Sequence, residues 1–169
     1  MILRDDLFIV GAIIMAIGVA IAAAKKTPLK KIIFWGIAYC YLLAVIGVTL
    51  FPIPLIGSDM GYAISANFVP LKSIILMLKY SSLYTIVTQI GGNVLISVPY
   101  GFLLGVVIKK IKPAKFFAPA FAFPFVIEFS QLFIGMAIGY SYRSFDVDDF
   151  ILNILGAYIG YFGGRVIRK

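Results

Sequence analysis

Five long apolar runs restrict what this chain can fold into. They cover approximately residues 7–24, 32–51, 86–108, 116–134 and 147–164. A run of about 18 or more apolar residues, rising about 1.5 Å per residue, is long enough to cross the roughly 30 Å hydrocarbon core of a membrane as a helix. The composition agrees, because 62% of the residues are hydrophobic and 13% are charged, whereas soluble domains are about 45–50% apolar and about 25% charged. The sequence therefore predicts an all-α integral membrane protein with a bundle of five transmembrane helices, and it excludes an ordinary soluble globule.

The basic residues are concentrated in three segments that predict the orientation of the chain. Residues 25–31 join the first two runs, residues 109–115 join the third and fourth, and residues 165–169 follow the fifth. Together they hold most of the 15 basic residues and none of the 7 acidic ones. Because basic loops face the cytoplasm, five crossings with the N-terminus outside and the C-terminus inside satisfy all three segments. A four-span arrangement would put one of them on the wrong side.

The long connection between the second and third runs is predicted to lie outside and to contain a short helix. Two lysines in it point to a different side from a row of apolar residues. Those apolar residues have the i, i+3, i+4, i+7 spacing of one helix face, and they are Leu71, Ile74, Ile75 and Leu78. The pattern is typical of an amphipathic helix that lies in the membrane interface or re-enters it. It is equally compatible with a short helix packed on the bundle.

The residue types that are scarce limit the chemistry. The chain has no histidine and a single cysteine, Cys40. This excludes Ser-His-Asp triads, intramolecular disulfides and zinc sites built from histidine or cysteine. We therefore expect no cofactor, and any chemistry must use carboxylates, arginine, tyrosine, serine or amides. The net charge of +8 would suggest nucleic acid in a soluble protein, but here the flanks of the spans account for it, so we expect no nucleic-acid partner.

Polar side chains occur at a similar depth in three of the predicted spans. An ionisable side chain at the centre of a membrane helix costs roughly 2.5–3.5 kcal/mol, so Glu128 is a candidate functional residue. Counted from the basic boundaries at about 1.5 Å per residue, Asn93, Glu128 and Asn153 lie about 18–24 Å up. That level is in the outer half of the core. We therefore predict one shared polar site that opens towards the outside.

The helix faces support a shared site. On the third span Gln89, Asn93 and Ser97 cluster, next to glycines and a proline that are expected to loosen the helix; on the fourth, Glu128 and Gln131 share a face. The fifth span carries a stripe within an arc of roughly 80° at about 100° per residue, whereas Asp148 points nearly the opposite way. The stripe consists of Asp146, Asp149, Asn153, Gly156 and Gly160. Its two glycines form a small-xxx-small pair that lets a neighbouring backbone approach closely.

Several of these residues have a structural interpretation beside a functional one. Arg143 can pair with Asp146 or Asp149 while an aspartate caps the last helix, or it can anchor a phosphate or carboxylate. Glu128 is either a buried structural carboxyl or a group that orients a ligand, and the two asparagines either join helices or contact the ligand. A hard-cation site made of Glu128, Asp146 and Asp149 is chemically possible, although the spacing is unspecific. No metal site is assigned.

Three segments of the chain form a recognisable pattern. They are Asn67-Phe68-Val69-Pro70; Gly92-Asn93-Val94-Leu95 with Pro99-Tyr100-Gly101-Phe102; and Glu128-Phe129-Ser130-Gln131 followed by Arg143, Asp146, Asp149, Asn153, Gly156 and Gly160. Together they resemble the VanZ-like family of bacterial membrane proteins over roughly residues 32–164. The first run then looks like an added helix. We predict an N-terminal segment of residues 1–31 and a VanZ-like four-helix domain of residues 32–169.

The resemblance implies a multi-pass protein of the bacterial cytoplasmic membrane and a link to resistance against teicoplanin, a lipid-tailed glycopeptide. The family has no firmly established reaction, so it implies a process and a set of positions. The predicted function is binding of an amphiphile in an outward-facing polar pocket, such as a lipoglycopeptide, a lipid-linked wall precursor or a membrane lipid. The alternatives are an intramembrane enzyme acting on a lipid head group, with Glu128 or Asp149 as acid–base, and a small flippase. An oligomer is possible.

The predicted ligand-binding residues combine the polar stripe with the resemblance. They are Asn67, Asn93, Glu128, Gln131, Arg143, Asp146, Asp149 and Asn153, and Gly156 and Gly160 are assigned to helix packing.

Overall fold

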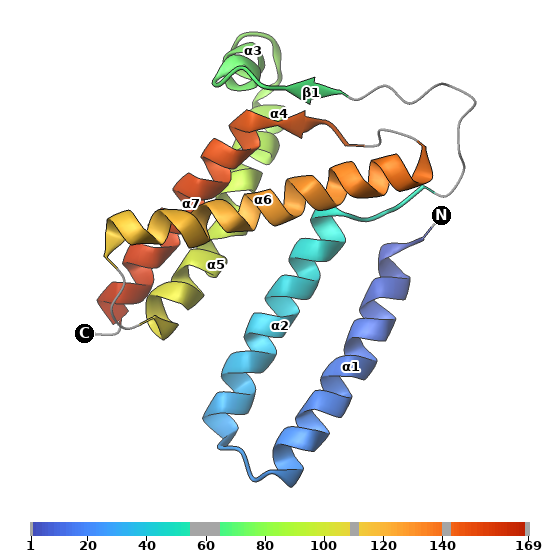
Figure 1. Ribbon diagram of the computed structural model, residues 1–169, viewed down its shortest axis with the longest axis vertical. Helices are drawn as coiled ribbons and strands as arrows, with labels where there is room; N and C mark the ends of the chain where they lie inside the picture. The colour runs from blue at the N-terminus through green and yellow to red at the C-terminus, as the bar shows by residue number, and fades with distance from the viewer. Residues whose placement is uncertain (1, 55–64, 109–111, 140–142, 168–169) are drawn as a thin grey trace. The chain divides into compact units, whose positions relative to one another are not determined.

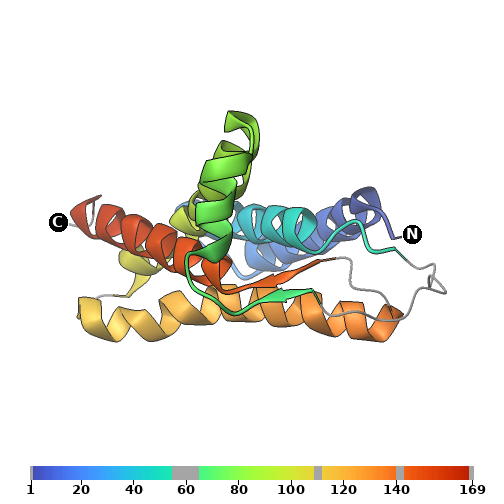
Figure 2. The same ribbon diagram turned by 90° about the horizontal axis from the view of Figure 1, so that it is seen from above.

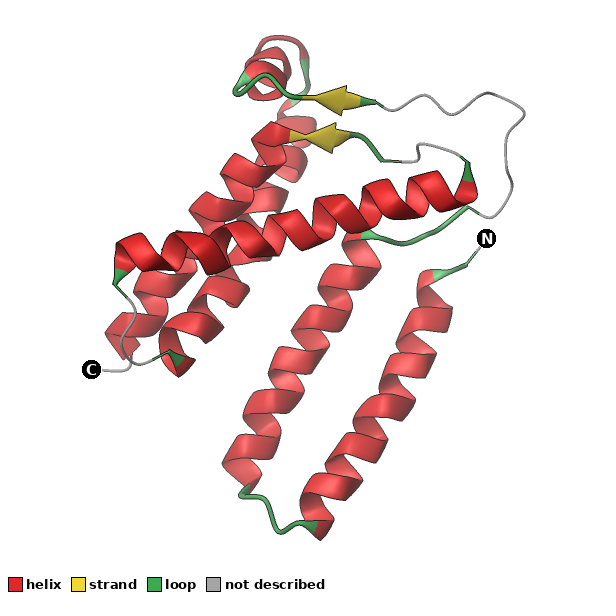
Figure 3. Cartoon of the chain, viewed as in Figure 1, coloured by secondary structure: helices red, strands yellow, loops and turns green. Residues whose placement is uncertain are grey.

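The computed structural model describes residues 2–54, 65–108, 112–139 and 143–167 and is mostly helical there (Figures 1 and 3). Five helical segments are long and apolar enough to cross a membrane. They are Arg4–Ala24 (α1), Leu29–Thr49 (α2), Leu83–Val107, Pro113–Ile138 (α6) and Val147–Ile167 (α7). The five long apolar helices predicted from the sequence are confirmed, with ends that differ by a few residues. Parts of the basic pattern, at residues 109–111 and 168–169, lie outside the described residues.

The third span consists of three consecutive pieces. Helix α4 (Leu83–Ile86) continues into a π-helical segment, η1 (Val87–Gly91), and then into α5 (Gly92–Val107), which contains Pro99. A π-helical turn is rare and is often found at functional sites. It ends at the glycine pair that the sequence expected to loosen this helix, and α5 then runs on to the polar residues.

By their internal contacts the residues form two compact units, Met1–Gly57 and Ser58–Lys169. The first unit is the hairpin of α1 and α2. Its helices meet where Leu43 packs against Gly11 and where the Tyr39 hydroxyl donates a hydrogen bond to the Gly11 carbonyl at 2.9 Å. The second unit contains every residue assigned to the candidate site. The predicted boundary between residues 31 and 32 stays a prediction.

Within the second unit, α5 and α7 pack backbone against backbone. A Cβ atom at Gly160 would lie 1.9 Å from the carbonyl oxygen of Val98, and one at Gly156 would lie 2.1 Å from that of Val94. From the facing helix, a Cβ at Gly101 would lie 1.9 Å from the carbonyl oxygen of Ala157. Only glycine permits such an approach. The two glycines that the sequence assigned to helix packing therefore lie at this contact.

Helix α6 crosses α5 and α7 obliquely (Figure 1). Buried residues of α6 and α7 form the hydrophobic core of this unit. Phe116 stacks on Tyr161 with ring centroids 4.1 Å apart, and both residues are fully buried. Between α5 and α6, the Tyr100 hydroxyl donates to the carbonyl of Pro119 at 2.9 Å. The three helices are thereby fixed against one another, which positions their polar residues.

Two short strands bring distant parts of the unit together. Strand β1 (Ala66–Asn67) pairs in parallel with β2 (Phe145–Asp146), so that Asn67 lies opposite Asp146 (Figure 3). Helix α3 (Lys72–Tyr80) follows β1, lies where the spacing predicted a short helix, and has no buried residue. Figure 2 shows α3, in green, pointing away from α6 and α7. That α3 lies in a membrane interface stays a prediction.

Candidate functional site

The strand pairing places Asn67 and Asp146 in direct contact. The side-chain amide of Asn67 donates to Oδ1 of Asp146 at 2.9 Å and to Oγ of Ser73 at 3.1 Å. The Ser73 hydroxyl donates in turn to Oδ2 of Asp146, and the backbone N–H of Asp148 donates to Oδ1 at 2.9 Å. Each oxygen of Asp146 therefore has at least one donor. Two residues that the sequence assigned to the site are brought together by elements far apart in the chain.

Asp148 caps helix α3. Its carboxylate accepts hydrogen bonds from the backbone N–H groups of Leu71, Ser73 and Ile74, and its side chain is only 1% exposed. The first N–H groups of a helix have no partner within it, and a negative charge is favourable there. Leu71 has a left-handed backbone with φ of 65°, which is uncommon for a residue other than glycine. Asp148 therefore anchors the start of α3 to the start of α7.

Below these residues, a layer of polar side chains joins α5 to α7. The amide of Asn93 donates to Oδ1 of Asp149. One turn further along α5, the hydroxyl of Ser97 donates to Oδ1 of Asn153. The amide of Asn153 donates to the backbone carbonyl of Asp149 at 2.7 Å. Ser97 and Asn153 are buried, so these side chains satisfy one another across the helix contact.

Glu128 approaches this layer from α6. It is 4% exposed, its charged neighbours are Asp149 and Asp146, and its carboxyl group has a hydrogen bond with the backbone of Asp146. Its second oxygen, Oε2, is buried and has no hydrogen-bond partner among the residues that the structure describes. Buried polar atoms almost always have a partner, so an exception calls for an explanation. This oxygen is therefore able to accept a hydrogen bond from a group outside the chain.

The other two predicted site residues border the cluster. Arg143 is exposed and lies two residues before Phe145, at the start of β2. Gln131 is half-buried on α6, within one turn of Glu128. Arg143 thus lies three residues before Asp146 in the chain, and Gln131 lies three residues after Glu128 on α6.

A row of phenylalanines on α6 leads away from this cluster, and we call it the phenylalanine row. Its rings follow one another at four-residue spacing with centroids 6.0, 5.9 and 4.1 Å apart. The row consists of Phe117, Phe121, Phe125 and Phe129, all of them exposed. At its upper end Phe129 meets Phe145 edge to face at 6.3 Å, and Phe145 lies next to Asp146. An apolar surface therefore begins directly beside the polar residues.

The carboxylates do not form a recognisable metal centre. Within the parts of the chain that the structure describes, no group of three or more His, Cys, Asp or Glu side chains has an arrangement that could hold a metal ion. The oxygens of Asp146 and Asp148 accept hydrogen bonds from amide and hydroxyl groups instead. The hard-cation alternative gains no support from this geometry.

Sequence reasoning missed several residues that build the site. Ser97 stood in the predicted cluster on the third span but was not assigned to the site, although it lies one turn from Asn93 and bonds Asn153. The role of Gly101 and Gly105 in close helix packing could have been predicted, because their four-residue spacing repeats that of Gly156 and Gly160. For Asp148, which was left out of the predicted stripe, nothing in the sequence indicated that it caps the start of α3.

Comparison with known proteins identifies the family of the chain. A family model described as VanZ/LLP1 matches residues 34–168. No curated protein and no solved structure matches the chain. The matched region begins within α2 and includes all of the candidate site.

Proposed function

The chain belongs to the VanZ/LLP1 family, and we propose that it binds an amphiphile with the head group at the polar cluster of α5, α6, α7 and the paired strands. The ligand is a lipid-tailed glycopeptide or a lipid-linked component of the cell envelope. By holding it, the protein contributes to resistance against glycopeptides of the teicoplanin type. The proposed contact residues are Asn67, Asn93, Glu128, Gln131, Arg143, Asp146, Asp149 and Asn153.

The observation that carries this proposal is the unpartnered oxygen of Glu128. It is a buried acceptor beside two further carboxylates, Asp146 and Asp149. Such a group favours a ligand that donates hydrogen bonds, for example through the hydroxyl or amino groups of a sugar or peptide head group. Arg143, exposed beside β2, supplies the opposite chemistry for a carboxylate or phosphate on the same head group.

The phenylalanine row supplies a surface for the tail. From Phe117 to Phe129 it extends about 18 Å at about 1.5 Å per residue, and its upper end lies beside Glu128 in sequence. An acyl chain packed along these rings would keep its head group next to the polar cluster. Polar contacts at one end and an apolar row leading away support an amphiphile rather than a small polar solute.

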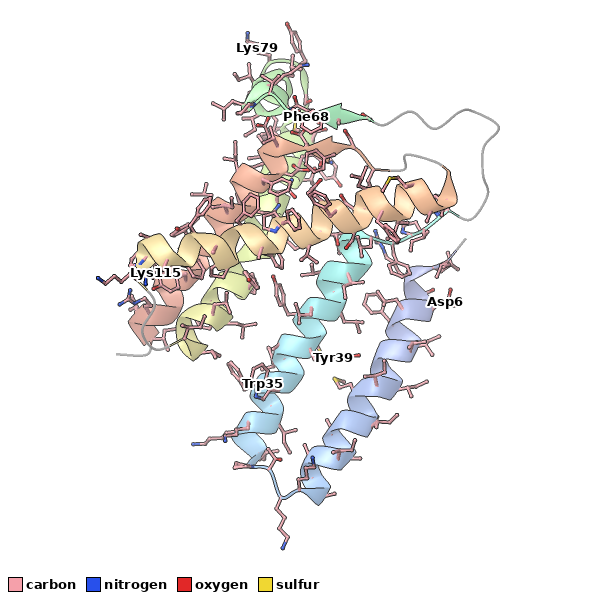
Figure 4. All side chains as sticks on the ribbon, viewed as in Figure 1. Asp6, Trp35, Tyr39, Phe68, Lys79 and Lys115 are labelled. Carbon is pink, nitrogen blue, oxygen red and sulfur yellow. The ribbon has the colours of Figure 1, made fainter. Side chains whose placement is uncertain are left out.

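We further propose that the polar cluster faces the outside of the bacterial cytoplasmic membrane. The three basic segments support an external N-terminus and a cytoplasmic C-terminus. In this orientation α3 lies outside, where its exposed apolar residues, such as Ile75, Leu76 and Leu78, can insert into the interface while its lysines remain in water. Lys79 projects from the end of α3 (Figure 4).

Arg143→Lys tests the proposed contact between Arg143 and a carboxylate or phosphate of the ligand's head group. Lysine keeps the charge but loses the planar fork that binds a carboxylate or phosphate through two hydrogen bonds. We expect teicoplanin to bind the purified variant in nanodiscs roughly tenfold more weakly than it binds the wild type. Isothermal titration calorimetry measures the difference.

The matched control is Arg165→Lys, at the other end of α7, where the guanidinium donates to the Tyr161 hydroxyl at 3.1 Å. A lysine there can still donate, so we expect unchanged affinity. If Arg143→Lys also binds as tightly as the wild type, Arg143 has only a structural role and the anion contact is wrong.

One observation also favours a second function, an intramembrane enzyme or flippase acting on a lipid head group. Glu128 and Asp149 are neighbouring carboxyl groups at the edge of an apolar surface, and such a pair can move a proton. Glu128→Gln separates the two functions, because it keeps the shape of the side chain but cannot titrate. We expect the variant to bind more weakly but still detectably, because the amide has one acceptor oxygen where the carboxylate has two, and we expect neither protein to form a product. Product formation by the wild type that is abolished in a folded variant would instead make Glu128 an acid–base residue.

A further inference from the structure

We propose that the α1–α2 hairpin holds one anionic phospholipid, with an acyl chain in the groove between the two helices and the phosphate at the basic end of the hairpin. This site lies in the first compact unit and is separate from the polar cluster. Its ligand is a structural lipid, and the proposal does not depend on the amphiphile-binding function.

The groove arises because the two helices touch along only part of their length. Near its closed end, Gly11 receives the side chain of Leu43, and Gly47 lies against the ring of Phe8. Nearer the connecting turn, a Cβ atom added at Gly18 or at Gly36 would meet no atom within 4 Å. The glycines at these two positions leave open space instead of a close helix contact.

The open space has a volume of about 290 Å³. Ligand pockets usually span about 300–1,000 Å³, so this one suits a single chain rather than a bulky molecule. Its walls are mainly apolar and include Ile14, Val19, Ala22 and Ile32. Such a groove within a membrane favours a hydrocarbon chain as its occupant.

The end of the groove near the connecting turn is polar and carries a positive charge. Thr27 and Lys31 line it there, and Lys31 belongs to a seven-residue segment, residues 25–31, that holds four lysines and no acid. Trp35 also lines this part and is 60% exposed, and Tyr39 lies between α1 and α2 further from the turn (Figure 4). Clustered lysines beside a membrane helix attract anionic lipids. The positive charge therefore favours a lipid whose head group has a net negative charge over a zwitterionic lipid, whose phosphate is balanced by its own cationic group.

The test measures lipid retained by the full-length protein, using phosphatidylglycerol and phosphatidylcholine with identical chains as probes. Native mass spectrometry counts lipids bound per protein. Gly18→Leu fills the groove from α1, and Gly36→Leu fills it from α2, which guards against one variant failing to fold. Ala12→Leu, an exposed position on α1 outside the groove, is the matched control. Lys31→Gln removes the charge at the rim, and Lys79→Gln on α3 is its control.

We expect one phosphatidylglycerol on the wild type, retained in preference to phosphatidylcholine. Lys31→Gln should weaken phosphatidylglycerol binding about fivefold, both leucine variants should lose the lipid, and both controls should keep it. Equal retention of the two lipids by the wild type would overturn the head-group assignment. Undiminished lipid in both leucine variants would show that the acyl chain does not bind in the groove. Loss of a dimer in these variants, with lipid content unchanged, would show that a second copy occupies the groove and would also overturn the proposal.

Discussion

Gly160→Ala is expected to yield little or no folded protein, although it adds only one methyl group. The new Cβ would lie 1.9 Å from the carbonyl oxygen of Val98 and 2.7 Å from the backbone N of Phe102. Both are backbone atoms of α5, so the clash cannot be relieved by rotating a side chain. Overpacking a core usually costs about 1–3 kcal/mol, and we expect more than about 3 kcal/mol here because two helices must separate. Size-exclusion chromatography of the detergent-purified protein measures the monodisperse fraction.

The matched control is Gly163→Ala, three residues further along the same helix. Its Cβ would lie 3.9 Å from a ring carbon of Phe102, which is ordinary van der Waals contact. The monodisperse fraction of this variant should equal that of the wild type or slightly exceed it, because alanine favours the helix over glycine by about 1 kcal/mol. Equal recovery of both variants would contradict the close packing of α5 and α7.

Asp148→Ala is expected to release the start of α3 from α7. Three backbone N–H groups, those of Leu71, Ser73 and Ile74, would lose their acceptor. Loss of a helix cap costs about 0.5–2 kcal/mol, and hydrogen bonds to a charged group are worth about 1.5–3 kcal/mol. We therefore expect a local loss of at least about 2 kcal/mol. Hydrogen–deuterium exchange should show faster exchange in the peptide containing these amides.

Asp6→Ala is the control for that measurement. Asp6 accepts a hydrogen bond from the backbone N–H of Leu3 at 3.0 Å, in the exposed first turn of α1. Its removal should speed exchange at that turn and leave α3 unchanged. If exchange in α3 is the same in Asp148→Ala as in the wild type, the cap does not hold α3 in place.

The spans could be predicted from the sequence because they depend on one local property. A run of about 18 or more apolar residues is long enough to cross a membrane as a helix whatever its neighbours are, and each of the five apolar runs falls on a helical segment that is long and apolar enough to do so. The polar stripe on α7 could also be predicted from the sequence, because helical periodicity alone places Asn153, Gly156 and Gly160 on one face. The faces of α5 and α6 follow from the same rule.

The contacts between segments far apart in the chain could not be predicted from the sequence. Strands of two residues, Ala66–Asn67 and Phe145–Asp146, are too short to give an alternating pattern, so their pairing could not be read from the sequence. Without that pairing, the start of α3 cannot be placed beside Asp148, so the sequence alone could not predict that Asp148 caps α3. The unpartnered oxygen of Glu128 was also invisible, since a sequence shows that a residue is polar but not which of its atoms lack partners.

We propose that the polar cluster beside the phenylalanine row binds an amphiphile without transforming it. The most direct measurement incubates the purified protein in nanodiscs with teicoplanin and a panel of lipid-linked wall precursors, followed by mass spectrometry of bound and free compounds. We predict that at least one compound is retained by the wild type, is retained less by Arg143→Lys, and is recovered chemically unchanged. Retention of no compound would show that the polar cluster does not bind these amphiphiles, and conversion of any compound to a product would show that the protein is an enzyme.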